Sequence, residues 1–127
     1  MTANGDLLIE RFKKAICQKL KEVSGINEVF YEHSRMAGYP RVRYIATVWT
    51  SDSALKGTLS CTVADNKESS TEVDRIANTL LRELEGFSFC ADDLMYYLHS
   101  GRVSPLEEAD KTVRQRLVTL EFYAMGG

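Results

Sequence analysis

The residues best suited to chemistry gather in one short segment in the second half of the chain. Cys90 is followed by Asp92, Asp93 and His99, which together could supply a nucleophile, an acid and a base. Two aspartates ahead of a strand are more often a turn or a local hydrogen-bonding device. Only His99 lies near enough in sequence to lower the pKa of the Cys90 thiol. We therefore expect no catalytic site and no enzyme activity.

Metal and cofactor sites are not indicated either. The two histidines, His33 and His99, are too few for a typical metal triad, and Glu32 would point away from His33 if both lay in a strand. No phosphate-binding glycine loop occurs. The cysteines form no CxxC pair and are expected to be reduced and mostly buried; they are Cys17, Cys61 and Cys90. The sequence predicts no cofactor and no metal.

Arginines and tyrosines alternate between residues 31 and 44. They are Arg35, Arg41 and Arg43, with Tyr31, Tyr39 and Tyr44. Such a mixture is typical both of surfaces that hold single-stranded nucleic acid and of protein interfaces. Sixteen Lys and Arg against eighteen Asp and Glu give a net charge of -2, without the basic excess usual in duplex-binding proteins. We favour a protein interface and keep a small nucleic-acid-binding or regulatory module as the alternative.

Length and composition indicate one globular domain over residues 1–127. Hydrophobic residues make up 44% and charged residues 27% of the 127 residues, as in ordinary globular proteins. No apolar run approaches the roughly 20 residues that cross a bilayer, so we expect no membrane partner. The start of the chain, MTANGDLLIERFKK, lacks the order of a signal peptide.

Two amphipathic helices are predicted. The first, residues 6–24, carries an apolar stripe at three- and four-residue steps and ends at Gly25; the stripe is Leu8, Phe12, Ala15, Ile16, Leu20 and Val23. The second, residues 70–85, begins with Ser69 and Glu72 spaced as a capping box and ends at Gly86. Its apolar side chains are Val73, Ile76, Ala77, Leu80, Leu81 and Leu84.

The remaining apolar stretches predict strands. An extended segment at 26–32 precedes a strand at 41–50, which has apolar groups on both faces and so is expected to have neither face fully exposed to water. A run at 58–65 is expected to pair with it as an antiparallel hairpin across a loop of about six residues. Short extended pieces at 87–89 and 94–99 follow, and a last strand covers 112–125. The polar segments 51–57 and 102–111 are predicted loops.

This order of elements predicts an α+β fold, with a mostly antiparallel mixed sheet and two main helices packed on one face. The opposite face of the sheet is then available. The mixed character of the strands at 41–50 and 112–124 leads us to expect that this face meets another protein surface.

The pattern resembles the tail terminator, or tail completion, proteins of long-tailed bacteriophages such as phage lambda. The resemblance spans nearly the whole chain. It is carried by the order of elements and by three segments, YPRVRYIATVW, EVDRIANTLLRELEG and EEADKTVRQRLVTLEFY. In the last segment the matching positions are Asp110, Thr112, Arg114, Arg116 and Phe122.

The resemblance implies a structural role in the virion tail, assembled in the bacterial host cytoplasm. Proteins of this family form a ring, usually a hexamer, that docks on the tail tube, stops its growth and presents the head-joining surface. The implied partners are copies of the chain, the tail tube protein and head-tail connector proteins, with nucleic acid limited to DNA passing through the ring. We predict interface residues at Arg41, Arg43, Trp49, Arg102, Asp110, Arg114, Arg116 and Tyr123, and that charge reversal at Arg114 or Arg116 weakens assembly more than folding.

Overall fold

The computed structural model describes the backbone of residues 2–26, 29–31, 38–51, 54–67, 69–91, 93–106 and 112–126. Its elements are α1 (Thr2–Ser24), β1 (Val29–Tyr31), β2 (Arg41–Ser51), β3 (Ala54–Asp65), α2 (Thr71–Leu84), β4 (Ser88–Ala91), β5 (Leu94–Pro105) and β6 (Arg114–Gly126). Among the described helices, none combines the length and apolar character needed to cross a membrane.

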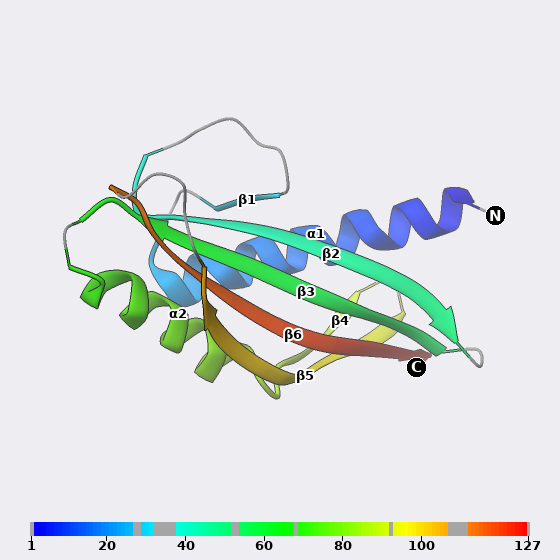
Figure 1. Cartoon of the computed structure of the whole chain (residues 1–127). Coiled ribbons are helices and arrows are strands. Elements are labelled where there is room, and N and C mark those ends of the chain that lie inside the picture. Colours follow the sequence, from blue (N-terminus) through cyan, green and yellow to red (C-terminus); the bar gives the residue numbers. More distant parts are fainter. Residues whose placement is uncertain are drawn as a thin grey trace.

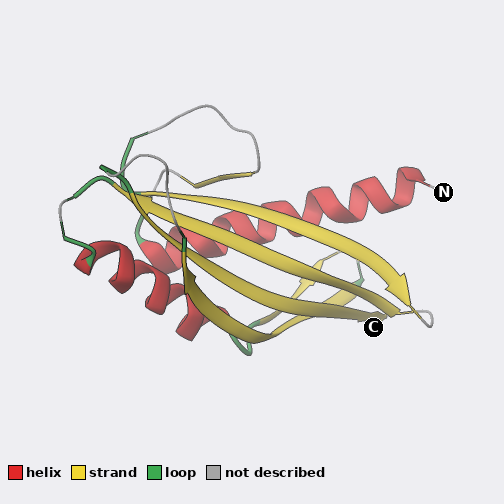
Figure 2. Ribbon diagram, viewed as in Figure 1, coloured by secondary structure: helices red, strands yellow, loops and turns green. Residues whose placement is uncertain are grey.

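The six strands form one curved sheet in the order β1-β2-β3-β6-β5-β4. β1 runs parallel to β2, and all other neighbours are antiparallel. Both helices pack on the same face of this sheet, α1 mainly over β1, β2 and β4, and α2 over β3, β5 and β6 (Figures 1 and 2). The predicted α+β class, with a mostly antiparallel mixed sheet and two helices on one face, is confirmed.

Three residues of the predicted apolar stripe of α1, Phe12, Ile16 and Leu20, are fully buried. Gly25 ends the helix with a φ of 71°, a left-handed conformation that glycine adopts without strain, and its amide donates to the carbonyl of Lys21 at 3.0 Å. The helix begins at Thr2, earlier than the predicted start at residue 6.

α2, Thr71–Leu84, is one residue shorter at each end than the predicted helix at 70–85, and the predicted capping box is wrong. Ser70 is the N-cap and forms no side-chain cap hydrogen bond, while the Ser69 hydroxyl accepts from the amide of Thr71 at 3.1 Å. The carboxylate of Glu72 instead accepts two hydrogen bonds from Arg75, at 3.1 and 2.6 Å. A charged partner one turn along the helix outcompetes the backbone amide for this carboxylate.

Two strands extend further than the sequence indicated. β3 begins at Ala54, so residues 52–53 alone separate it from β2, in place of the predicted six-residue loop. β5 continues to Pro105 through a bulge between His99 and Arg102, where Ser100 has a φ of 53°. A bulge bends a strand without ending its pairing. The polar, glycine-containing stretch at this bulge therefore belongs to β5, although its composition resembles that of a loop. β1, Val29–Tyr31, lies within the predicted extended segment 26–32, of which residues 27–28 and 32 lie outside the described chain.

The core lies between the helices and the sheet. Phe12 of α1 stacks on Phe122 of β6 with ring centroids 4.5 Å apart, and Phe89 of β4 stacks on Tyr96 of β5 at 5.1 Å. These rings join the first helix to the last three strands. Asp65 is a polar exception: it is buried, and its Oδ2 atom has no hydrogen-bond partner among the described residues.

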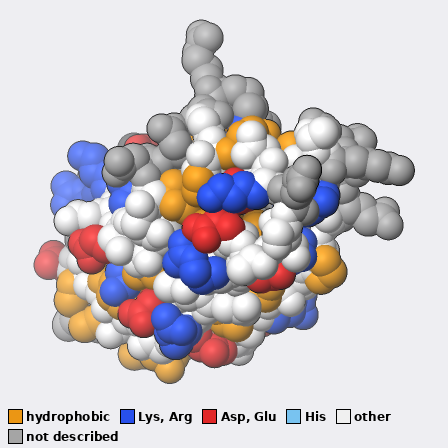
Figure 3. Space-filling model, turned by 90° about the vertical axis from the view of Figure 1, so that its left-hand side faces the viewer, with side chains coloured by type: hydrophobic (Ala, Val, Ile, Leu, Met, Phe, Trp, Pro, Cys, Tyr) orange, Lys and Arg blue, Asp and Glu red, His pale blue; other side chains and the backbone are white. Residues whose placement is uncertain are grey.

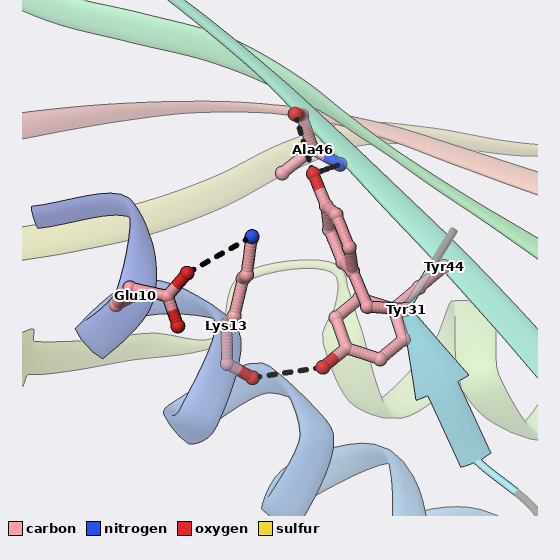
Figure 4. Close-up of polar contacts among 5 residues, drawn as sticks. All are labelled: Glu10, Lys13, Tyr31, Tyr44 and Ala46. Atoms are coloured by element: carbon pink, nitrogen blue, oxygen red, sulfur yellow. Dashed lines mark hydrogen bonds and ion pairs between the residues drawn. The ribbon is translucent and has the colours of Figure 1, made fainter. Parts of the chain in front are cut away.

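Two tyrosines fasten α1 to the β1–β2 edge (Figure 4). The Tyr44 hydroxyl donates to the carbonyl of Lys13 at 3.1 Å. The Lys13 ammonium lies 4.0 Å from the centre of the Tyr31 ring and 3.2 Å from a carboxylate oxygen of Glu10. Burial, then the nearby Cys17, raises the pKa of Tyr44 above its ordinary value, so this phenol stays a neutral donor.

Candidate functional site

The candidate site is the outer face of the sheet, which we define as the face opposite the two helices. Because side chains alternate along a strand, the neighbours of each buried residue point to this face. Every large hydrophobic side chain that is exposed in the described part of the chain lies here, on β2, β5 or β6: Ile45, Trp49, Met95, Tyr97 and Met125. Ile45 and Trp49 are 36% and 47% exposed, so this face of β2 is partly open to solvent in the single chain.

One end of the outer face is rich in aromatic and sulfur-containing side chains, and we call it the aromatic zone. The register aligns Trp49, Lys56, Tyr123 and Tyr97 across four strands, with Met125 and Met95 in the next row. Tyr97 and Tyr123 have ring centroids 5.4 Å apart. Trp49, Lys56 and Tyr123 also line a shallow hollow of about 240 Å³ together with His99 and Glu121. A hollow of this size and lining suits a partner side chain.

The other end of the outer face carries arginines and hydroxyl groups, and we call it the arginine zone. One row aligns Arg43, Thr62, Leu117 and Ser104, and the next aligns Ile45, Ser60, Thr119 and Arg102. Arg43 and Arg102 are both exposed. Neither forms an ion pair with a described carboxylate. The described side chains of these two rows include no acid, and Glu121 lies in the adjoining row of the same face.

The structure places five of the eight predicted interface residues on the outer face. They are Arg41, Arg43, Trp49, Arg102 and Tyr123, which the strand register brings to one surface. The guanidinium of Arg41 lies 4.3 Å from the centre of the Tyr39 ring. Arg102 belongs to β5, so the predicted loop at 102–111 is wrong for residues 102–105. Asp110, like Arg35 of the alternative nucleic-acid patch, lies outside the described residues.

Arg114 and Arg116 point to the helix side of the sheet instead. They pair in register with Asp65 and Val63, both buried under the helices. Arg116 Nε donates to Asp74 Oδ1 of α2 at 2.6 Å, and its Nη1 donates to the carbonyl of Gln115 at 2.8 Å. Because this guanidinium already joins α2 to β6, reversing its charge disturbs the subunit itself. The expectation that Arg116 acts mainly in assembly therefore loses its structural basis.

Charges of both signs alternate over the end of the molecule where β2 and β6 start and α2 begins (Figure 3). The ion pairs of α2 belong to this region: Arg116 with Asp74, and Arg75 with Glu72. Hydrogen bonding from Arg75 lowers the pKa of the Glu72 carboxyl, and Glu72 in turn raises the pKa of Arg75. Arg116 and Arg75 are thus paired with carboxylates of their own subunit.

Of the described residues considered for chemistry, Cys90 and Asp93 line one hollow of about 490 Å³ with Leu94 and Met95, and His99 does not line it. Cys90 and His99 both lie on the outer face, but they are two rows apart, about 13 Å along the strands. The Cys90 thiol contacts Met95 Sδ at 3.9 Å, whereas His99 Nδ1 contacts the Ser100 hydroxyl at 2.9 Å. Asp93 occupies a turn with a φ of 65°. Asp92, His33 and Glu32 lie outside the described residues.

Sequence analysis missed the aromatic zone as a unit. It named Trp49 and Tyr123 but not Met95, Tyr97 or Met125, which share their two rows. The alternation of β5 and β6 was visible in the sequence. The pairing of β5 with β6, which decides which residues lie side by side, could not be read from that alternation.

Comparison with known proteins establishes the fold alone. No protein-family model and no curated protein matches the sequence. Ten chains of solved structures are similar in fold. One of them superposes with a TM-score of 0.75, covering 97% of this chain and 96% of its own at 12% identity, and its printed name states neither organism nor activity.

Proposed function

We propose that this protein is a structural assembly protein of the bacteriophage tail. It forms a ring that caps the tail tube, stops tube polymerisation and provides the head-joining surface. The observation that carries the proposal is the outer face, where all the exposed large hydrophobic side chains of the described chain gather. A monomeric protein rarely leaves such a patch open unless another surface covers it, and Trp, Tyr and Met are enriched at protein interfaces.

The geometry of the sheet supports a ring of identical subunits. A head-to-tail contact between copies closes into a ring when the rotation per subunit is right. β1 pairs with Val42, Arg43 and Tyr44 alone, so in the described structure the outer edge of β2 beyond these residues has no neighbouring strand. An open edge together with an apolar face offers two different surfaces to a copy of the chain, as a head-to-tail contact needs.

Capping also requires that the ring not recruit more tube subunits. The two ends of the outer face differ in chemistry, because one is aromatic and the other is hydroxyl-rich and basic. A surface that recognises the last tube ring on one side and presents different chemistry on the other would end polymerisation. The partners would be further copies of this chain, the tail tube protein and a head-tail connector protein.

The test adds the purified protein to tail tube subunits polymerising in vitro, with tube length measured by electron microscopy and size in solution by light scattering. The expected result is shorter tubes with a ring at one end, at a molar ratio set by the number of tube ends. Tubes that grow to their usual length in excess protein would reject the proposal. Rejection combined with tight, salt-dependent binding of the single subunit to nucleic acid would favour the regulatory alternative.

A further inference from the structure

One row of the aromatic zone consists of sulfur-containing side chains from three neighbouring strands. Cys90 of β4 pairs in register with Met95 of β5, and Met95 pairs with Met125 of β6. All three side chains are exposed on the outer face. Cys17 and Cys61, by contrast, are half-buried and buried. The row therefore gathers every thioether and the one exposed thiol of the described residues.

The first two sulfur atoms are spaced as ligands of one metal ion would be. Cys90 Sγ lies 3.9 Å from Met95 Sδ. Metal–sulfur bonds are about 2.3 Å long, so ligand atoms in a planar three-coordinate site lie about 4.0 Å apart. Met125 faces Met95 from the other side, where β-carbons of paired residues are about 4.5–5.5 Å apart. Its unbranched, freely rotating side chain allows its sulfur to reach the same point.

The space beside the first two sulfur atoms is open to an ion. Cys90, Asp93, Leu94 and Met95 line a hollow of about 490 Å³. The Asp93 carboxylate adds a negative charge that attracts cations to this hollow. Soft ligand atoms and a negative charge thus border the same space.

The types of ligand atom decide which metal ion fits. Thiolate and thioether sulfur together favour Cu(I). Structural Zn²⁺ sites take four ligands from cysteine, histidine and carboxylate side chains, and no group of three or more such residues gathers among the residues that the structure describes. Ca²⁺ and Mg²⁺ need several oxygen ligands. The sulfur row therefore matches a soft monovalent ion.

We propose that Cys90, Met95 and Met125 bind one Cu(I) ion in a three-coordinate site. The Cys90 thiol releases its proton and the thiolate bonds to the ion, while each thioether sulfur donates an electron pair. The charges of thiolate and ion cancel, and no electron is transferred. The sequence indicated no metal site because these ligands come from three strands that only the sheet brings together. The site lies within one subunit, so it does not depend on the proposed ring.

The test titrates the full chain with Cu(I) under anaerobic, reducing conditions, in competition with the coloured Cu(I) chelator bicinchoninate. The wild-type chain should bind one ion, more tightly as pH rises, because binding releases a proton. The variants Cys90→Ser, Met95→Leu and Met125→Leu each remove one ligand. Each should weaken binding by at least roughly 10-fold, the lower end of what the loss of even an outer-shell partner costs.

Cys17→Ala is the matched control, because it removes a half-buried thiol that lies 4.0 Å from the carbonyl of Val29. Its affinity for Cu(I) should equal that of the wild-type chain. Circular dichroism reports whether each variant is folded, and light scattering reports the number of chains per particle.

X-ray absorption at the copper edge identifies the ligands directly. In protein made with selenomethionine, copper should have two selenium neighbours and one sulfur neighbour. Met95→Leu and Met125→Leu should each leave a single selenium neighbour. Copper surrounded by sulfur alone would show that the thioethers do not bind it, and would overturn the inference.

Three results of the titration would also overturn it. Wild-type affinity in both methionine variants would mean that the Cys90 thiol acts alone. An equal loss in Cys17→Ala would place the ion elsewhere. One ion per two chains, with a doubled mass in light scattering, would indicate a thiolate bridge between copies.

The outcomes separate the copper site from the proposed function. A chain that binds Cu(I) through the three sulfur atoms but never caps tubes keeps the site and rejects the capping role. A chain that caps tubes but does not bind Cu(I) rejects the site and leaves the capping role intact.

Discussion

The hydroxyl of Tyr31 forms hydrogen bonds with both the carbonyl and the amide of Ala46. It donates to the Ala46 carbonyl at 3.2 Å and accepts from the Ala46 amide at 3.4 Å (Figure 4). Tyr31 is the last residue of β1, and Ala46 lies on β2 just beyond the three residues that β1 pairs with. A side chain therefore continues the pairing where the short strand ends, and it closes the first open position on this edge.

We predict that Tyr31→Phe lowers the free energy of unfolding by about 1–2 kcal/mol, because two hydrogen bonds to backbone groups are lost. Hydrogen exchange at the Ala46 amide should accelerate more than exchange at amides in β3. Urea denaturation and amide exchange measure the two effects. Tyr123→Phe is the control, since the Tyr123 hydroxyl forms no hydrogen bond with a described residue. Equal stability of the two variants would show that water replaces the Tyr31 bonds without cost.

The Arg116–Asp74 pair should stabilise the subunit. Arg116 is 20% exposed and Asp74 is 44% exposed, so solvent screening limits the pair to about 1 kcal/mol. We expect Arg116→Glu to destabilise folding by about 1–2 kcal/mol, because like charges then face each other and the bond to Gln115 is lost as well. The double variant Arg116→Glu/Asp74→Arg should recover part of that loss in denaturant unfolding. If the double variant is no more stable than Arg116→Glu, the Arg116–Asp74 pair contributes nothing to the free energy of unfolding.

Substitutions in the aromatic zone should affect assembly and leave folding unchanged. We expect Trp49→Ser, Tyr97→Ser and Met125→Ser each to change the free energy of unfolding by less than about 0.5 kcal/mol, as exposed positions usually do. If the zone is an interface, at least one should weaken ring formation or tube capping by about 2 kcal/mol or more. Sedimentation and tube-length measurements report this. Asn78→Ser, on the exposed side of α2, is the matched control. If all three aromatic-zone variants assemble as well as Asn78→Ser, the aromatic zone is not an interface.

The cysteines should react according to their burial. Burial raises the pKa of the Cys61 thiol to about 12, and Cys90 is exposed. At neutral pH a thiol reagent should therefore label Cys90 in the folded protein and reach Cys61 only on unfolding. Because the folded state keeps the Cys61 proton that the unfolded chain releases near pH 9, stability should fall as pH rises from about 9 towards 12. Cys61→Ala should remove that part of the alkaline loss, and mass spectrometry and urea titrations check both points.

The helices and the layer arrangement were predictable because their signals are local. Ile16 and Leu20 recur at helical spacing, and Gly86 stands where a left-handed residue ends α2. The sheet was less predictable, since its register depends on contacts between residues far apart in the sequence. Ser100 and Gly101 have the composition of a turn, and the pairing of β5 with β6 turns them into a bulge.

The candidate site could be predicted only in part for the same reason. Alternation alone put Trp49 on a face different from Val48, and the same rule applied to Arg116 would have put it beside Val118, on the buried face. Which strand then neighbours which is settled by the tertiary fold. The aromatic zone exists only once β6 lies between β3 and β5.

The position of β6 has a consequence for how a subunit is made. It is the last of the six strands along the chain, yet it lies in the middle of the sheet between β3 and β5. Until β6 has been made, no strand can join β3 to β5, and Phe12 lacks the Phe122 ring on which it stacks. Nascent or prematurely ended chains thus lack the finished outer face.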